Sequence, residues 1–276
     1  MKIATKKLLI RAKRNIFGEL AGNNISLKSG DGFDFYELRP YNYGEDVRRV
    51  DWKRSAKMGK PYVKLFHEEK ELQILIVPIL SGSLKFGLQR LKQDVVAEIV
   101  ALLGFSALKN SDRYSVITCK NKDVNPTKLS KKEALLYGVV EDILDGDFLG
   151  ISTGFEEVNE FILKRYKRRS MVVFVGDFWS IPNLKYLAKK HEALALIVRD
   201  KFEEDPKPIG QISQINPDNL SISNLFVDKS VASRMAQKAK EHDAKLIGSL
   251  LKQGIRMQKI YTDDNVFSKL SHFLGS

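Results

Sequence analysis

Short apolar runs alternate with longer amphipathic segments from residue 72 onwards. The run at residues 72–80 is continuous, as expected of a strand that is buried on both faces of a sheet. The other runs predict further strands, and the amphipathic segments predict helices that bury one face. Because strands and helices alternate, we predict an α/β fold with three layers, in which helices cover both faces of a mostly parallel sheet. The predicted strands cover residues 72–80, 112–119, 170–176, 193–198 and 255–261, and the predicted helices cover residues 88–109, 130–144, 155–168 and 230–248, followed by a terminal helix.

Three local signals refine this prediction. Ser130 precedes Glu133 by three residues, which is the spacing of a helix capping box. Three prolines predict an irregular excursion over residues 202–218. The inward stripe of the predicted helix at residues 88–109 consists of Val95, Ile99, Leu102, Leu103 and Ser106.

Residues 3–17 predict a basic amphipathic helix. Leu8, Ala12 and Ile16 recur there at helical spacing among lysines and arginines. Such a helix can lie on a membrane, but its apolar face is short, so packing against the protein's own core is the favoured interpretation. Glycines then break the chain into turns and short strands. We therefore divide the chain into an N-terminal extension, residues 1–70, and a sheet domain, residues 71–276.

The composition is that of a globular protein, since 43% of the 276 residues are hydrophobic. The single cysteine, Cys119, follows an apolar run, which favours a buried structural thiol in a reducing compartment. The sequence contains no run of about 18 apolar residues that could span a bilayer. Its N-terminus has too short an apolar run for a signal peptide. We therefore expect a cytoplasmic location.

The formal net charge of +12 is unevenly distributed along the chain. Residues 1–70 carry 16 lysines and arginines against nine acidic residues, so they contribute more than half of the net charge. This bias suits nucleic acid, an anionic membrane surface or an acidic protein surface as a partner, although a generally basic protein is the simpler interpretation. A second basic run at residues 164–169 contains Tyr166 as a stacking group. A solvated helix end is favoured there over a nucleic-acid site.

The sequence offers no recognisable catalytic arrangement. Its four histidines are scattered, and no two share one helical face. It lacks the glycine-rich phosphate-binding motifs and the nucleophile elbow of hydrolases. The acidic cluster of Glu68, Glu69 and Glu71 is more simply explained by ion pairing than by acid–base catalysis. We therefore expect a protein without enzymatic activity.

Residues 35–69 combine charged, aromatic and turn-forming residues at high density. We expect their charged side chains to form one ion-paired cluster beneath aromatic rings. The segment closely resembles the signature of the family called domain of unknown function 58 (DUF58), whose members carry a von Willebrand factor A-like domain after it. The resemblance implies a von Willebrand A-like, Rossmann-type sheet domain from residue 71. The residues that carry the resemblance are Arg39, Tyr41, Gly44, Asp46, Arg48, Asp51, Trp52, Ser55, Lys64 and Glu68.

The resemblance also implies a place for a metal ion. A-type domains hold a divalent cation in a metal-ion-dependent adhesion site, built from an Asp-x-Ser-x-Ser element, a later threonine and a later aspartate. Ser81, Ser83, Thr153 and Asp177 match this pattern, whereas Ile79 replaces the first aspartate. Because Mg²⁺ needs carboxylates and dehydrates reluctantly, we expect a vestigial site without a cofactor, with weak Mg²⁺ or Mn²⁺ binding as the alternative. Replacing Ile79 by aspartate is expected to strengthen binding if the rest of the site is intact.

The leading expectation for function rests on fold and family analogy, because the family has no agreed biochemical activity. A-type domains present the loops at the carboxyl edge of the sheet to a partner, here residues 81–85, 150–154 and 177–180. Phe178 and Trp179 are the docking residues expected there. Members of the resembled family are often encoded beside MoxR-type AAA+ ATPases, which implies an adaptor role in chaperone-like remodelling. The alternative is a polyanion-binding protein whose basic N-terminal region contacts nucleic acid or a membrane surface.

Overall fold

The chain forms two compact units. The sheet unit consists of the N-terminal helix and the described residues from Leu72 onwards, and the small unit consists of the described residues between 35 and 71. The expected extension of residues 1–70 is therefore divided between the units, because its first helix packs with the sheet. The computed structural model describes residues 2–18, 35–44, 47–66, 71–151, 154–217 and 220–275.

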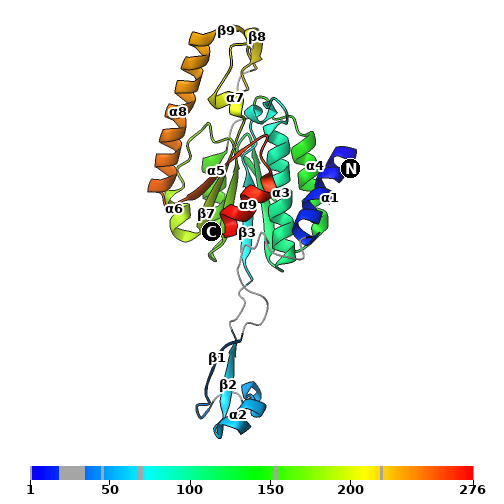
Figure 1. Ribbon diagram of the computed structural model, residues 1–276, viewed down its shortest axis with the longest axis vertical. Helices are drawn as coiled ribbons and strands as arrows, with labels where there is room; N and C mark the ends of the chain where they lie inside the picture. Colours follow the sequence, from blue (N-terminus) through cyan, green and yellow to red (C-terminus); the bar gives the residue numbers. More distant parts are fainter. Residues whose placement is uncertain are drawn as a thin grey trace. The chain divides into compact units, whose positions relative to one another are not determined.

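A six-stranded sheet forms the centre of the sheet unit (Figure 1). Its strand order is β10-β7-β6-β3-β4-β5, in which β5 pairs antiparallel with β4 and the other neighbours are parallel. Side chains of β3 alternate between two cores, because successive residues of a strand point to opposite faces. The predicted mostly parallel α/β sheet is confirmed. The strands are β3 (Gln73–Pro78), β4 (Arg113–Lys120), β5 (Asp123–Pro126), β6 (Met171–Gly176), β7 (Glu192–Arg199) and β10 (Arg256–Tyr261).

Helices cover both faces of this sheet (Figure 1). On one face, α3 is almost completely buried, because α1, α4 and α9 pack around it. On the other face, α5, α6 and α8 enclose the second apolar core. The helices are α1 (Ile3–Gly18), α3 (Lys92–Lys109), α4 (Glu133–Asp145), α5 (Phe155–Arg165), α6 (Lys185–Lys190), α8 (Lys229–Lys252) and α9 (Val266–Gly275).

Helix α1 packs against α3 through its apolar face. Leu9, Ala12 and Ile16 are buried, and Leu8 is partly buried. The Lys109 ammonium donates to the carbonyl of Ile16 at 2.7 Å, which satisfies one of the last carbonyls of α1. The expected packing of this helix against the protein's own core is confirmed, with Leu9 deeper than Leu8.

The small unit joins a two-stranded antiparallel sheet to one short helix. Asp51 caps this helix by accepting a hydrogen bond from the Arg54 amide at 3.1 Å. Gly59 ends it with a φ of +67°, a left-handed conformation that glycine adopts without strain. The buried hydroxyl of Ser55 accepts from the Tyr62 amide at 2.8 Å, so the helix is fixed to the sheet. The elements are β1 (Phe35–Pro40), the 3-10 turn η1 (Val47–Arg49), α2 (Trp52–Met58) and β2 (Tyr62–Phe66).

The predicted capping box of α4 is wrong. The helix begins at Glu133 with Lys132 as its N-cap, and Ser130 instead pairs with Tyr114 in an isolated β-bridge. The Glu133 carboxylate binds Lys13 of α1 at 2.7 Å. The Glu133 side chain, which the local pattern assigned to the cap, therefore forms a tertiary ion pair between α1 and α4 instead.

The predicted irregular excursion at residues 202–218 is wrong in part. It includes most of a short helix, α7, and then a strand, β8, that pairs antiparallel with β9. Two prolines lie between α7 and β8 and the third follows β8, so the prolines flank these elements without interrupting them. The elements are α7 (Lys201–Glu204), β8 (Gly210–Ile215) and β9 (Ile222–Val227).

Candidate functional site

The strand order reverses beside β3. The next strand of the chain, β4, lies on one side of β3, whereas β6 lies on the other. In open α/β sheets, such a switch point creates a crevice at the carboxyl ends of the strands. Ser81 and Ser83 follow β3, and Asp177 follows β6, so the fold brings all three residues to this edge.

Three of the residues that were mapped by resemblance are in contact here. The hydroxyl oxygens of Ser81 and Ser83 are 2.8 Å apart, and Ser83 Oγ donates to Asp177 Oδ2. Ile79, in the place of the first aspartate, is buried in the apolar core on the α5 face of the sheet. Thr153 lies outside the described residues. These matched residues therefore supply one carboxylate and two hydroxyl groups.

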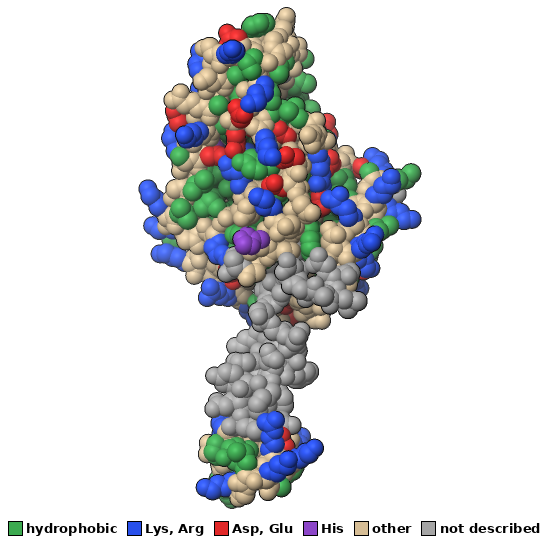
Figure 2. Space-filling model, viewed as in Figure 1, with side chains coloured by type: hydrophobic (Ala, Val, Ile, Leu, Met, Phe, Trp, Pro, Cys, Tyr) green, Lys and Arg blue, Asp and Glu red, His purple; other side chains and the backbone are tan. Residues whose placement is uncertain are grey.

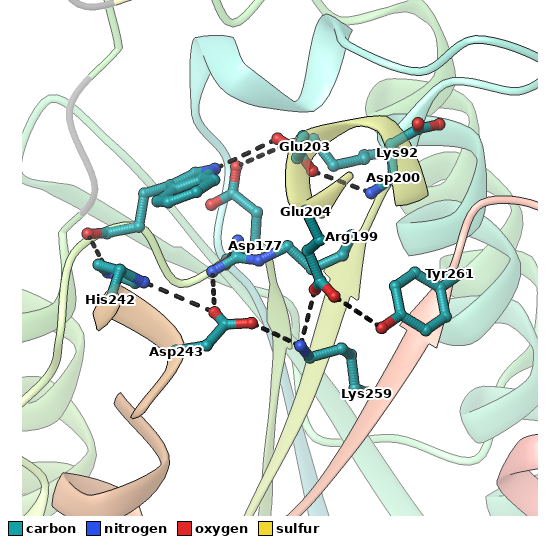
Figure 3. Close-up of polar contacts among 11 residues, drawn as sticks. Lys92, Asp177, Arg199, Asp200, Glu203, Glu204, His242, Asp243, Lys259 and Tyr261 are labelled. Carbon is teal, nitrogen blue, oxygen red and sulfur yellow. Dashed lines mark hydrogen bonds and ion pairs between the residues drawn. The ribbon is translucent and has the colours of Figure 1, made fainter. Parts of the chain in front are cut away.

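A buried lysine completes the arrangement (Figure 3). Lys92, in the first turn of α3, is fully buried, and its Nζ lies 3.2 Å from Asp177 Oδ2 and 2.7 Å from Glu203 Oε1. Glu203 belongs to α7, where its other oxygen accepts from the Asp200 amide at 2.9 Å in a capping box. An isolated charge is strongly disfavoured in a protein interior. These two ion pairs are therefore what allows Lys92 to lie at this depth.

A second group of ion pairs adjoins the first through Arg199 (Figure 3). This buried arginine, at the end of β7, donates to the Asp177 carbonyl and to Asp243 Oδ1 of α8, the latter at 3.1 Å. Asp243 also pairs with Lys259 of β10, whose Nζ lies 2.7 Å from Glu204. These contacts tie α3, α7 and α8 to the sheet. We call Lys92, Asp177, Arg199, Glu203, Glu204, Asp243 and Lys259 the carboxyl-edge cluster.

Ion pairing in the carboxyl-edge cluster shifts the pKa of Asp243 and the pKa of Lys259. Burial alone would raise the pKa of Asp243, but the hydrogen bonds and charges of Lys259 and Arg199 outweigh burial and lower this pKa. Burial alone would lower the pKa of Lys259, but its bonds to Asp243 and Glu204 raise it. Burial and a 2.8 Å hydrogen bond to Glu204 raise the pKa of Tyr261. The shifts of Asp243 and Lys259 both favour the charged forms that pair.

The two aromatic residues expected to dock a partner have different surroundings. Phe178 is fully buried, and its ring centroid lies 5.6 Å from that of Phe155, so its selection as a docking residue is wrong. A φ of +54° at this position turns its ring back into the core. Trp179 is 38% exposed, its indole N–H donates to Glu203 at 3.3 Å, and its ring lies 4.1 Å from the guanidinium of Arg199. Trp179 alone stays a candidate contact at this edge.

Pro217, which follows β8, lies against the same edge. The Pro217 carbonyl accepts from the Gly150 amide at 2.7 Å. A Cβ atom at Gly82 would lie 2.6 Å from that carbonyl oxygen, so the close approach requires glycine. Gly82 opens the 3-10 turn η2 (Gly82–Lys85), which carries Ser83. A segment that is distant in sequence therefore packs beside the two serines.

The residues at this edge do not fit a divalent metal ion. Mg²⁺ and Mn²⁺ prefer several oxygen ligands, with carboxylates among them. Asp177 is already bound to Ser83 and Lys92, and Ile79 supplies no ligand. Within the described ranges, no group of three or more His, Cys, Asp or Glu side chains is arranged to hold a metal ion.

Several signature residues of the small unit stabilise its local structure. Asp51 caps α2, Ser55 joins α2 to β2, and Gly44 adopts a φ of +100° in a turn. Trp52, in contrast, is 66% exposed, and the expected ion-paired cluster beneath aromatic rings stays a prediction. Of the other signature residues, Arg39 and Tyr41 are half-buried, Arg48 is exposed, Lys64 lies in β2, and Asp46 and Glu68 lie outside the described residues.

Comparison with known proteins identifies the chain. The family described as proteins of unknown function DUF58 matches residues 37–245. The chain belongs to this family. Uncharacterized proteins from Mycobacterium tuberculosis and Mycobacterium bovis are each 23% identical to it over 281 residues, which cover 99% of this chain and 88% of the relative.

Two solved structures resemble the fold at low identity. An aerotolerance-related membrane protein from Bacteroides fragilis matches with a TM-score of 0.47 and 11% identity, over 73% of this chain and 96% of that protein. The conserved hypothetical protein BatB from Bacteroides thetaiotaomicron matches with a TM-score of 0.41 and 10% identity, over 74% of this chain and 97% of that protein.

The DUF58 signature segment also forms an apolar pocket of about 480 Å³, which lies within the small unit. Two of its lining side chains, Val47 and Trp52, are 54% and 66% exposed. In Figure 2, hydrophobic side chains of the small unit gather on its surface beside lysines and arginines. The lining residues are Tyr41, Val47, Val50, Trp52, Ser55, Ala56, Gly59, Lys60 and Pro61.

Two further side chains that were selected from the sequence, Cys119 and Tyr166, are both buried. Cys119 is buried, as expected of a structural cysteine, and burial raises the pKa of its thiol. Tyr166 is buried as well, so it cannot serve as the stacking group for nucleic acid at residues 164–169. In the part of the chain that is described, every helix is too short or too polar to cross a membrane.

Proposed function

We propose that this DUF58 protein is a non-enzymatic protein-interaction module that docks a partner in the pocket of the small unit. The pocket is the observation that supports the proposal best. Val47 and Trp52 expose more than half of their surface beside it. Large apolar side chains gain free energy when a partner removes them from water. Tryptophan is also enriched among the residues that dominate binding energies.

The charge around the pocket indicates the kind of partner. Residues 35–66 hold eight lysines and arginines against four acidic residues. Lys53, Lys57 and Lys60 are exposed, and Lys60 lines the pocket itself. Complementary charge speeds encounter and fixes the register of a complex. We therefore propose that the ligand is an acidic protein segment that places an apolar side chain in the pocket.

We further propose that the partner is a MoxR-type AAA+ ATPase and that the protein acts as an adaptor in chaperone-like remodelling. Membership of the DUF58 family supports this partner, since members are often encoded beside such ATPases. A fold by itself does not define a function. The partner is therefore tested by direct binding.

The experiment is capture of a purified MoxR-type ATPase by the immobilised full-length chain. Trp52→Ala is expected to weaken capture ~30-fold, the effect of losing a binding hot spot worth about 2 kcal/mol. Tyr186→Ala is the matched control, because it removes an exposed aromatic ring from α6 of the sheet unit. Unchanged capture by a folded Trp52→Ala protein would contradict the pocket as the docking site.

The carboxyl edge is the competing docking surface, and Trp179 reports on it. Trp179→Ala removes an exposed ring and the hydrogen bond to Glu203. Loss of capture with Trp179→Ala but not with Trp52→Ala would move the docking site to this edge. If neither substitution affects capture, both surfaces are rejected.

Polyanion binding is the second candidate function, favoured by the net charge of +12 and the exposed lysines of the small unit. Ionic strength separates the two functions. Binding to nucleic acid or to anionic vesicles falls steeply with added salt, because counterions are released from the polyanion. Binding through an apolar pocket falls much less, and it depends on Trp52.

A further inference from the structure

We propose that the ammonium group of Lys92 takes the place of the divalent cation at the carboxyl edge, so that the domain carries its own cation on a covalent tether. Lys92 Nζ bridges Asp177, which follows β6, and Glu203, which lies on α7 (Figure 3). A bound metal ion bridges oxygen ligands from separate elements in the same way. Lys92 holds this place whether or not the protein docks a partner through the small unit.

The hydroxyl groups support this assignment. Ser83 Oγ donates its proton to Asp177 Oδ2, the same oxygen that Lys92 approaches. Ser81 Oγ lies 2.8 Å from Ser83 Oγ and extends the chain of hydroxyl groups. The two serines are therefore organised around the carboxylate, and Lys92 supplies the positive charge.

The charges at the site differ from those of the A-type pattern. That pattern offers two aspartates to a cation of charge +2, whereas here Ile79 replaces one of them and the Lys92 ammonium, with a charge of +1, lies between the carboxylates of Asp177 and Glu203. The side chains of Lys92 and Asp177 are at most 2% exposed. A second cation at Asp177 would meet the ammonium at very short range, where like charges repel strongly in a protein interior. Lys92 thus excludes a metal ion as well as replacing it.

The tethered cation changes the expected effect of restoring the missing aspartate. The sequence pattern suggests that Ile79→Asp alone strengthens metal binding. With Lys92 in place, the new carboxylate is added beside an ammonium that already neutralises Asp177. We therefore expect metal binding only when Ile79→Asp is combined with removal of the ammonium.

The test is calorimetric titration of the full-length protein with MgCl₂ and MnCl₂, with circular dichroism as the check on folding. Four proteins are compared: wild type, Ile79→Asp, Lys92→Met and the double variant. Methionine retains the length of the lysine without its charge. The wild type and Ile79→Asp are expected to show no saturable heat. The double variant is expected to bind Mn²⁺ at least ~10-fold more tightly than either single variant, a change typical of groups that contact metal ligands.

Two results would overturn the proposal. One is saturable, submillimolar binding by the wild type, and the other is equal affinity of Ile79→Asp and the double variant. If the double variant folds poorly without metal, Mn²⁺ is expected to raise its Tm and to leave the wild-type Tm unchanged. A Tm that Mn²⁺ does not raise would also count against the proposal. Ile79→Asp/Lys92→Gln keeps a hydrogen-bond donor near Asp177 without the charge, so it is expected to bind Mn²⁺ as well.

Discussion

Asp51 and Ser55 show how single polar side chains build the small unit. Helix α2 has seven residues, which is too few for a helix to be stable by itself in water. The Asp51 carboxylate satisfies the amide of Arg54, and the Ser55 hydroxyl joins the helix to β2. Because α2 carries Trp52 and part of the pocket wall, the shape of the pocket depends on these two contacts.

We expect Asp51→Ala to destabilise α2 by about 0.5–2 kcal/mol, the usual cost of a lost N-cap. Asp51→Asn is the control, because the asparagine side chain keeps a cap oxygen. Hydrogen exchange of the amides of residues 52–58 measures the effect directly, with the amides of α3 as an internal reference. Equal losses in both variants would show that the negative charge of Asp51 matters more than the cap.

Some of the single residues at the carboxyl edge could be predicted from the sequence. Ser81, Ser83 and Asp177 could be grouped, because parallel strands end at a common edge and a family pattern orders the residues. Lys92 and Glu203 could not be predicted to join this group, since each looks like an ordinary charged residue near a helix start. Lys92 is buried against Asp177, which is 85 residues away in the chain, and against Glu203, which is 111 residues away.

Helix α8 is attached to the sheet by apolar packing and by ion pairs. Leu246 and Leu250 enter the apolar core. Near them, Asp243 pairs with Arg199 of β7 and Lys259 of β10. A buried carboxylate that lost these partners would be strongly destabilising. The position of α8 therefore depends on the protonation state of Asp243.

This attachment predicts a dependence of stability on pH. The folded-state pKa of Asp243 lies below its ordinary value of 3.8, so its contribution is present above that pH and is lost as the pH falls through the lowered pKa. The pKa of Lys259 is raised above 10.5, so its contribution is lost only as the pH rises through the raised pKa. Asp243→Asn is expected to lower the Tm at neutral pH and to flatten its fall below about pH 4.

The control for Asp243→Asn is Glu241→Gln, which changes an exposed carboxylate two residues away on α8. Its Tm is expected to follow the wild-type pH profile. Thermal unfolding between acid and neutral pH gives both profiles. An Asp243→Asn profile as steep as that of the wild type would assign the acid sensitivity to other carboxylates.

Prediction of single elements succeeded where burial is complete and failed where it is partial. The strands β3, β6 and β7 are buried on both faces, so their apolar runs were unmistakable. In contrast, β8 has two isoleucines, three positions apart, among glycine and polar residues, and among the described strands it pairs with β9 alone. The sequence of such a short, half-exposed ribbon has no clear strand pattern, and the three nearby prolines favour an irregular segment instead. The predicted cap of α4 was wrong because Glu133 forms a tertiary ion pair with Lys13.

At the scale of the whole molecule, the order along the chain and the order in space differ. Helix α1 belongs to the sheet unit, although the small unit separates it from β3 in the sequence. Its amphipathic pattern predicted a buried face but could not identify the element that covers it. The strand order likewise depends on contacts between distant segments, which periodicity does not encode.

We expect Ile16→Ala to destabilise the sheet unit by about 2–5 kcal/mol, because it opens a cavity between α1 and α3. Ile10→Ala, on the exposed side of the same helix, is the control and is expected to have little effect. Urea unfolding followed by circular dichroism measures both. Equal stability of the two variants would mean that α1 adds nothing to the sheet unit.

The division of the chain also has a mechanical consequence. The small unit is inserted in the sequence of the sheet unit, so a load applied to the small unit reaches the sheet unit along two routes. One route ends at α1, which is held by side-chain packing, and the other at β3, which is hydrogen-bonded between β4 and β6. A steady pull would therefore peel α1 away first and uncover the apolar surface of α3, while the sheet stays intact.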